Sequence, residues 1–328
     1  MLKNSMIKSL LKSISKKITA KQDKTNTNLF CSINNNINKL VLCDVGGAGG
    51  LQPRWKLFEK NIKIIFVEPD KRSSQELKKM NCEVIEKGLW SEKTRKKFYL
   101  TKKSQTSSIY KPNRVYVDLF PKADRFDIVD TIEIDLDVMD NFIKELSQPH
   151  FIKLDIQGSE LEVLKGSKNT LKNVLGLEVE INFKYMYENI PLANEIENFL
   201  INEGFVLNDY LSFIRWERDD HRGFGEITHG DALFLRSPEK IFEMGQNIAD
   251  PISLYENYVK ILFVYNKLDL IKKIAEKISE KDKKTLNIDS IILNLEKKHK
   301  RLIFINRLTN YYTRHLVSKN NLFNHWNI

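Results

Sequence analysis

The stretch LVLCDVGGAGG, residues 40–50, joins a short apolar run to a turn that contains four glycines. The apolar run predicts a buried strand, and the glycines predict a tight turn into a helix. Backbone amides in such a turn can approach a ligand closely, because no Cβ stands in the way. The next apolar run ends in Phe66-Val67-Glu68-Pro69-Asp70. An acid about 20 residues beyond the glycine turn accepts hydrogen bonds from the two hydroxyls of a ribose, so Glu68 predicts a nucleoside-bearing cofactor.

Short apolar runs alternate with helical periods from residue 39 to residue 238, which predicts an α/β domain with a mostly parallel sheet covered on both faces. After residue 238 the strand signals stop and helical periods dominate. We therefore expect a basic amphipathic helix and linker at 1–38, the sheet domain at 39–238 and a helical appendage at 239–328. The expected strands are Leu40–Val45, Ile62–Glu68, Cys82–Glu86, Thr131–Ile134, Phe151–Ile156, Val174–Ile181, Phe205–Leu207 and Ala232–Leu235. The expected helices of the sheet domain are Gln52–Lys60, Lys71–Met80, Gly158–Lys172 and Ala193–Glu203.

Charge is distributed unevenly along the 328 residues, whose net charge is +10. Residues 1–30 and residues 239–328 each carry a net +6, so the segment between them carries −2. The sheet domain therefore shows no preference for polyanions, and we expect no nucleic-acid partner. The helix expected at residues 2–18 either packs on the main domain or contacts a membrane surface through its lysines. Three cysteines without CxxC spacing favour a reducing cytoplasm, and no apolar run is long enough to span a bilayer.

The glycine turn excludes the commonest dinucleotide-binding pattern. The fingerprint GxGxxG, counted from Gly47, would need its third glycine where Gln52 stands. The pattern present is an acid followed by small residues at every second position, Asp44, Gly46, Ala48 and Gly50. This arrangement resembles the loop of class I S-adenosylmethionine (SAM) methyltransferases, which cradle no pyrophosphate.

Five segments in order carry a more specific resemblance: DVGGAGG, FVEPD, IKLDIQGSELEVLKG, LGLEVEINFKYMYENIP and GDALFL. Together they resemble FkbM-type SAM-dependent methyltransferases over residues 40–237. The resemblance implies a Rossmann-like sheet of seven strands whose last strand is antiparallel. It also implies transfer of a methyl group from SAM to a hydroxyl, often on a sugar or glycan.

The resemblance also implies which residues bind the cofactor. The family loop usually reads Asp-x-Gly-Ala-Asn-x-Gly, whereas Gly47 and Ala48 occupy its Ala and Asn positions here, so one polar contact to the cofactor is missing. The expected cofactor-binding residues are Asp44, Gly46, Gly47, Ala48, Gly50, Glu68, Pro69, Leu89, Ser108 and Asp155.

Removal of the hydroxyl proton calls for a base near the methyl group. Asp155 and Glu180 end adjacent central strands, and His221 and His229 lie in or beside the glycine-rich segment before the last strand. Asp155 could instead bind the amino group of SAM. As a less favoured alternative, Asp155, Glu180 and Asn182 hold a divalent cation such as Mg²⁺, which prefers such oxygen ligands. Five aromatic residues lie in or beside the loops expected to rim the pocket and could stack on a sugar ring, although core packing explains most aromatic residues: Trp90, Tyr185, Tyr187, Phe213 and Trp216.

A second function remains open from the sequence. The altered Gly47-Ala48 pair fits a non-catalytic module with a methyltransferase fold, recruited through its helical tail. The basic tail could also mediate homo-oligomerisation or contact a membrane surface.

Overall fold

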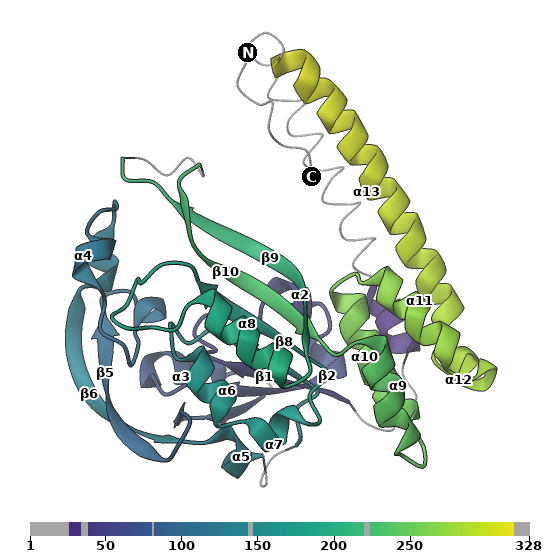
Figure 1. Cartoon of the computed structure of the whole chain (residues 1–328), viewed down its shortest axis with the longest axis horizontal. Helices are drawn as coiled ribbons and strands as arrows, with labels where there is room; N and C mark the ends of the chain where they lie inside the picture. The colour runs from purple at the N-terminus through teal and green to yellow at the C-terminus, as the bar shows by residue number, and fades with distance from the viewer. Residues whose placement is uncertain (1–25, 34–38, 81, 144–146, 220–223, 318–328) are drawn as a thin grey trace.

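The computed structural model describes residues 26–33, 39–80, 82–143, 147–219 and 224–317. Its centre is a seven-stranded sheet in the order β3-β2-β1-β7-β8-β10-β9 (Figure 1). In this order, the five strands β3, β2, β1, β7 and β8 pair in parallel with their neighbours. Strand β10 is antiparallel to both β8 and β9. This topology confirms the predicted Rossmann-like sheet with an antiparallel last strand. The strands are β1 (Leu40–Val45), β2 (Ile62–Val67), β3 (Glu83–Ile85), β7 (Phe151–Leu154), β8 (Gly176–Asn182), β9 (Val206–Trp216) and β10 (Glu226–Leu235).

Helices cover both faces of this sheet, because the central strands are apolar on both sides. Leu40, Leu42 and Phe66 face one layer, whereas Val41 and Cys43 face the other. The first layer contains α2 (Pro53–Lys56), α3 (Lys71–Leu77) and C-terminal helices; the second contains α5 (Met139–Phe142), α6 (Glu160–Lys165), α7 (Lys168–Leu171) and α8 (Ala193–Asn202). The single helix expected over Gly158–Lys172 is thus divided into α6 and α7. The division falls at Gly166, where a Cβ would lie 2.2 Å from the carbonyl oxygen of Trp90.

A second sheet of three strands, in the order β4-β6-β5, stands beside the first. The strand expected at Thr131–Ile134 belongs here and not to the seven-stranded sheet. Most of β6 is exposed to solvent, so it lacks the two-sided burial of the central strands. The elements are β4 (Gly88–Leu89), β5 (Thr94–Thr101), β6 (Ile128–Asp137), α4 (Arg114–Val117) and the 3₁₀ helices η1 (Glu59–Asn61), η2 (Ser104–Thr106) and η3 (Ala123–Phe126).

The C-terminal helices pack on the sheet at the end of the molecule opposite β5 and β6 (Figure 1). The ring centroids of Tyr265 and Phe151 are 5.3 Å apart, and those of Trp55 and Phe151 are 5.2 Å apart. No helix in the described part of the chain is long and apolar enough to cross a membrane. The helix expected at residues 2–18 lies outside the described residues, and the predicted domain boundaries stay predictions. The helices are α9 (Pro238–Gln246), α10 (Ile252–Val264), α11 (Leu268–Lys277), α12 (Glu280–Thr285) and α13 (Ile288–Val317).

Candidate functional site

The glycine turn after β1 is held between the ends of β2 and β7. The amide of Gly46 donates a hydrogen bond to the carbonyl oxygen of Val67 at 2.9 Å. Gly46 has a φ of +86°, and a Cβ there would lie 1.9 Å from the carbonyl oxygen of Asp155. Only glycine therefore fits this position. The close approach brings the turn against Asp155 at the carboxyl edge of the sheet, where open α/β sheets bind ligands.

Glu68 follows β2 and is 5% exposed. One of its carboxylate oxygens, Oε1, accepts a hydrogen bond from the amide of Asp70 at 2.8 Å. Asp70 is fixed in turn, because it caps α3 and pairs with Arg72. Burial raises the pKa of Glu68 to about 7, although the amide of Asp70 acts in the opposite direction. The fold therefore keeps a carboxyl group at this position despite the cost of burying its charge.

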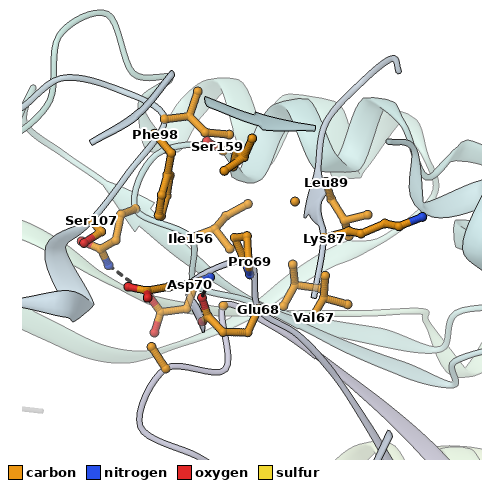
Figure 2. Close-up of a pocket in the computed structure, with 18 of the residues that line it drawn as sticks. Val67, Glu68, Pro69, Asp70, Lys87, Leu89, Phe98, Ser107, Ile156 and Ser159 are labelled. Carbon is orange, nitrogen blue, oxygen red and sulfur yellow. Dashed lines mark hydrogen bonds between the residues drawn. The ribbon is translucent and has the colours of Figure 1, made fainter. Parts of the chain in front are cut away.

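A cavity opens between the glycine turn, Glu68 and the second sheet (Figure 2). Its empty volume is about 620 Å³, which includes space open to solvent. Glu68 and Asp70 lie on one side, and Phe98 and Ser159 lie on the other (Figure 2). Six residues predicted to bind the cofactor line this cavity: Gly46, Ala48, Glu68, Pro69, Leu89 and Asp155.

The other four predicted cofactor residues do not line this cavity. Asp44 is 1% exposed and pairs with the buried Lys153. Gly47 packs against the ring of Phe66, and Gly50 closes the turn with a hydrogen bond to the carbonyl oxygen of Gly47. The hydroxyl of Ser108 donates to the carbonyl oxygen of Gln157 at 2.7 Å, and its neighbour Ser107 lines the cavity.

Lys153 lies between two carboxylates at the ends of β1 and β7. Its Nζ is 3.5 Å from Asp44 Oδ1 and 3.2 Å from Asp155 Oδ2. Burial disfavours the charge of Lys153, but Asp44, Asp155 and Glu178 outweigh burial and raise its pKa. Burial also raises the pKa of Asp44 to about 6, with Lys153 opposing the shift. Asp155 is the most exposed of the three and faces the cavity.

A second cavity adjoins the first and shares Gly46, Ala48, Gln105, Asp155 and Gln157 with it. Its empty volume is about 850 Å³, again with solvent-open space included. Glu180, His229 and Trp216 line the second cavity only. The predicted catalytic residues Asp155, Glu180 and His229 therefore lie together, whereas His221 lies outside the described residues.

Gln157 connects the side chains of Asp155 and Glu180 through hydrogen bonds. Its Nε2 donates to Asp155 Oδ1 at 3.1 Å and to Glu180 Oε2 at 3.0 Å, and its Oε1 accepts from the Tyr187 hydroxyl at 2.9 Å. Its φ of +58° is costly for a residue with a side chain. Sequence reasoning missed this role of Gln157. The available signal was its position immediately after the strand that carries Asp155.

Glu180 and His229 occupy adjacent strands. Burial raises the pKa of Glu180 well above its ordinary value, and the nearby Asp155 adds to the shift. Burial lowers the pKa of His229 to about 4. His229 Nε2 is 3.9 Å from Glu180 Oε1, beyond hydrogen-bond distance, and its Nδ1 is 2.9 Å from the hydroxyl oxygen of Thr228.

The tautomer of His229 is coupled to the direction in which the Thr228 hydroxyl donates. The Thr228 hydroxyl donates its single proton to the carbonyl oxygen of Ile214 at 3.2 Å. With the Thr228 proton placed on that bond, His229 Nδ1 is the donor in its contact with Thr228, and Nε2 has its lone pair on the side of Glu180.

The aromatic residues expected around the acceptor separate into distinct roles. Trp216 lines the second cavity, and Tyr187 is buried behind it against Gln157. Phe213 is exposed on β9, where its ring lies tilted against that of Tyr210, and it does not line either cavity.

Residues 44–207 match the profile of the methyltransferase FkbM domain. This match spans half of the chain. The chain belongs to the FkbM methyltransferase family. No curated protein sequence matches it significantly.

Solved structures similar to this FkbM protein are methyltransferases with low sequence identity. The magnesium protoporphyrin IX methyltransferase of Synechocystis PCC 6803, solved with bound SAM, is 12% identical over 68% of this chain and 83% of its own, with a TM-score of 0.31. The precorrin-6y C5,15-methyltransferase of Geobacter metallireducens is 11% identical over 65% and 87%, with a TM-score of 0.33. A putative tRNA methyltransferase of Streptococcus pneumoniae is 11% identical over 82% and 97%, with a TM-score of 0.30. These scores are low, so the fold assignment follows from the strand order and the family assignment from the matched residues.

Proposed function

We propose that this FkbM protein transfers a methyl group from SAM to a hydroxyl of a saccharide or related small acceptor. One observation carries the proposal: the cavity with Glu68 adjoins the cavity with Glu180 and His229, and Asp155 belongs to both. Methyl transfer requires donor and acceptor sites that open onto each other, because the reacting atoms must approach in line at about 3–3.5 Å. The FkbM family assignment supports the methyl transfer, and the polar lining of the second cavity supports a hydroxylated acceptor.

The residues of the first cavity fit SAM. The amide of Asp70 holds Glu68 Oε1, and the carboxylate lines the cavity, so it can accept hydrogen bonds from ribose hydroxyls. Leu89, Phe98 and Ile156 provide apolar surface for the adenine ring. Asp155, at the junction of the cavities, is suited to the positively charged amino group of the cofactor.

SAM, when bound, supplies a methyl group on a positively charged sulfur. The protein's own contribution is to orient the acceptor hydroxyl and to accept its proton. Burial, with Asp155 adding to it, raises the pKa of Glu180 in this cavity. The pKa of His229, lowered by burial to about 4, keeps the ring neutral near neutral pH, and His229 lines the same cavity with Nε2 3.9 Å from Glu180 Oε1. We therefore assign the base to His229 and the stabilisation of the resulting imidazolium to Asp155, whose charge raises the pKa of His229 against the effect of burial.

Two alternatives receive less support. No cluster of three or more His, Cys, Asp or Glu side chains suited to a metal ion occurs among the described residues. The side chain of Asn182 is buried without a hydrogen-bond partner in the described structure, and it does not line the cavity beside Asp155. A non-catalytic module would not need the acceptor cavity to hold a neutral histidine beside a carboxyl group. A cytoplasmic location is part of the proposal, supported by the three free cysteines.

The experiment begins with isothermal titration of the protein with S-adenosylhomocysteine (SAH), the demethylated cofactor. We expect saturable binding that weakens at least about tenfold in Glu68→Ala, because a charge-assisted hydrogen-bonding group is lost. Glu76→Ala is the matched control, since Glu76 is exposed on α3 and its described ion pair is with the exposed Lys79. Undetectable SAH binding to the folded protein would overturn the proposal.

The second step measures transfer of labelled methyl groups from SAM to a panel of saccharides. Transfer to a hydroxyl supports the proposed activity. SAH binding without transfer to any member of the panel favours the non-catalytic module.

A further inference from the structure

Arg125 lines the second cavity, the proposed acceptor cavity, and does not line the first, the proposed cofactor cavity. It belongs to η3, which follows a residue in the left-handed region, Lys122, with a φ of +62°. The carbonyl oxygen of Arg125 accepts hydrogen bonds from the amide of Lys103 at 3.2 Å and the hydroxyl of Thr106 at 2.9 Å. These bonds fix the backbone of Arg125 to the loop that borders both cavities.

The guanidinium group of Arg125 lies against aromatic rings. Its Cζ is 4.4 Å from the centroid of Trp216 and 5.1 Å from that of Phe126. Trp216 is 5% exposed, so this stack lies within the cavity wall and not on the outer surface. Stacking holds the planar group in one orientation and removes part of its water.

The charge of this guanidinium has no carboxylate partner among the residues that the structure describes. Arg125 Nε is buried and has no hydrogen-bond partner within that part of the chain. Burial accordingly lowers the pKa of Arg125, although the group stays charged at all ordinary pH values. A half-buried, unpaired arginine in a ligand cavity has hydrogen-bonding capacity that a ligand can complete.

Arg125 and the proposed base stand at different points of the same cavity. Trp216 separates them, because its ring stacks on Arg125 and meets the His229 ring edge-on, with centroids 6.0 Å apart. An acceptor that binds Arg125 at one end can therefore present a hydroxyl to His229 at the other. The fixed arginine would select both the acceptor and its orientation.

We propose that Arg125 binds an anionic group, a carboxylate or a phosphate, on the hydroxylated acceptor. The inference depends on the proposed methyltransferase function and adds the charge of the substrate to it. Arginine suits both groups, because its planar fork donates two parallel hydrogen bonds to either. Lys103, an exposed residue of the same cavity, adds positive charge at the rim.

The test compares three probes on the protein saturated with SAH and on the protein without it. D-glucuronate carries the carboxylate, D-glucose 6-phosphate carries the phosphate, and D-glucose carries neither. We expect saturable binding of at least one anionic probe by isothermal titration, at least about tenfold tighter than that of glucose. The anionic probe with the higher affinity identifies which of the two groups the site prefers.

Variants separate a binding role of Arg125 from a structural one. Arg125→Gln should weaken binding of the anionic probe about tenfold or more and leave the affinity for glucose unchanged. Arg125→Lys should recover part of the affinity for the anionic probe, because it restores the charge. Arg95→Gln is the control, since Arg95 is exposed on β5 and pairs with Glu133 and Asp135. Thermal melting and SAH affinity report whether each variant is folded.

Three results would overturn the inference: no saturable binding of either anion, glucose binding as tightly as the anions, or unchanged anion affinity in Arg125→Gln. Failure of the proposed function looks different, because SAH binding would then be lost in the unaltered protein. The titrations without SAH keep the anion site testable in that case.

Discussion

At the scale of single residues, the folded protein and the cofactor favour opposite protonation states of Glu68. Burial raises the pKa of its carboxyl to about 7, yet only the ionised form accepts hydrogen bonds from both ribose hydroxyls. SAH affinity should therefore fall as the pH is lowered from 8 to 6, by about tenfold, because the ionised fraction falls by that factor below a pKa of 7. Isothermal titration at several pH values measures this dependence.

Glu68→Gln provides the control for this pH dependence, because its SAH affinity should be weak and constant over the same range. The stability of the ligand-free protein depends on pH in the opposite direction to SAH affinity. Between the unfolded pKa of about 4.5 and the folded pKa of about 7, the folded protein binds the extra proton, so the stability of the ligand-free protein falls as the pH rises. Glu68→Gln should remove this contribution, and a pH-dependent SAH affinity that persists in the variant would contradict the assignment.

His229 gives a second prediction at this scale. His229→Asn should lower kcat about 10²–10⁴-fold, because the base for the acceptor proton is lost. SAH affinity should stay unchanged, because His229 does not line the cofactor cavity. Rates with a methylated saccharide acceptor from the panel measure the first effect, and titration measures the second. An equal loss of SAH affinity would instead indicate a collapse of the site.

Residues at strand ends were predictable from the sequence, and residues outside strands were not. Asp155 and Glu180 follow from the rule that carboxyl ends of parallel strands meet at one edge. Gln157 and Arg125 do not follow from this rule. Gln157 acts through a left-handed backbone conformation, and Arg125 enters the cavity from η3, whose approach to Trp216 depends on tertiary folding. Neither feature has a spacing that sequence patterns detect.

At the scale of elements, a buried hydrogen-bonded group joins α10 to the sheet. The hydroxyl of Tyr265, the residue that ends α10, donates to Glu178 Oε2 at 2.5 Å, and Trp55 Nε1 donates to the same hydroxyl at 3.3 Å. Glu178 is fully buried, and its Oε1 has no hydrogen-bond partner within the described structure. The Tyr265 hydroxyl is therefore the hydrogen-bond donor to this carboxyl group, with Arg54 3.6 Å away.

Tyr265→Phe should lower the free energy of unfolding by about 1–3 kcal/mol, because it leaves a buried carboxyl group without its hydrogen bond. Denaturant unfolding measures the change. Tyr255→Phe is the matched control. Tyr255 is also a buried tyrosine of α10, but its hydroxyl makes no hydrogen bond to the described residues, so its loss should cost less than about 0.5 kcal/mol. Equal effects of both substitutions would contradict the role given to Glu178.

The predicted elements agree best with the structure where burial is strongest. β1, β2, β7 and β8 have nearly continuous apolar sequences, because both faces of the sheet are covered. β5 was missed, because the lysines of its solvent-exposed face conceal the strand pattern. β9 was predicted too short for the same reason: beyond Leu207 it is the edge strand of the sheet and mostly polar or half-exposed.

At the scale of the whole molecule, the predicted boundary at residue 238 marks a change in the type of element, and the hydrophobic core continues across it. Tyr258, Ile261 and Leu262 of α10 belong to the same buried cluster as Leu42 of β1 and Phe151 of β7. The C-terminal helices thereby provide one of the two layers that a sheet of this kind must have. A methyltransferase sheet without them would expose a large apolar face to water.

Removal of residues 240–328 should therefore abolish cooperative unfolding and SAH binding together, because the sheet loses one of its covering layers. A shorter truncation after Arg301 is the control, since the buried residues of α13 in the described cluster end at Leu295. The protein truncated after Arg301 should fold and bind SAH like the full chain. Circular dichroism during thermal unfolding and titration with SAH measure the two properties. If the sheet domain alone unfolds cooperatively and binds SAH, the helices are an independent appendage and the shared core contributes little to the stability of the site.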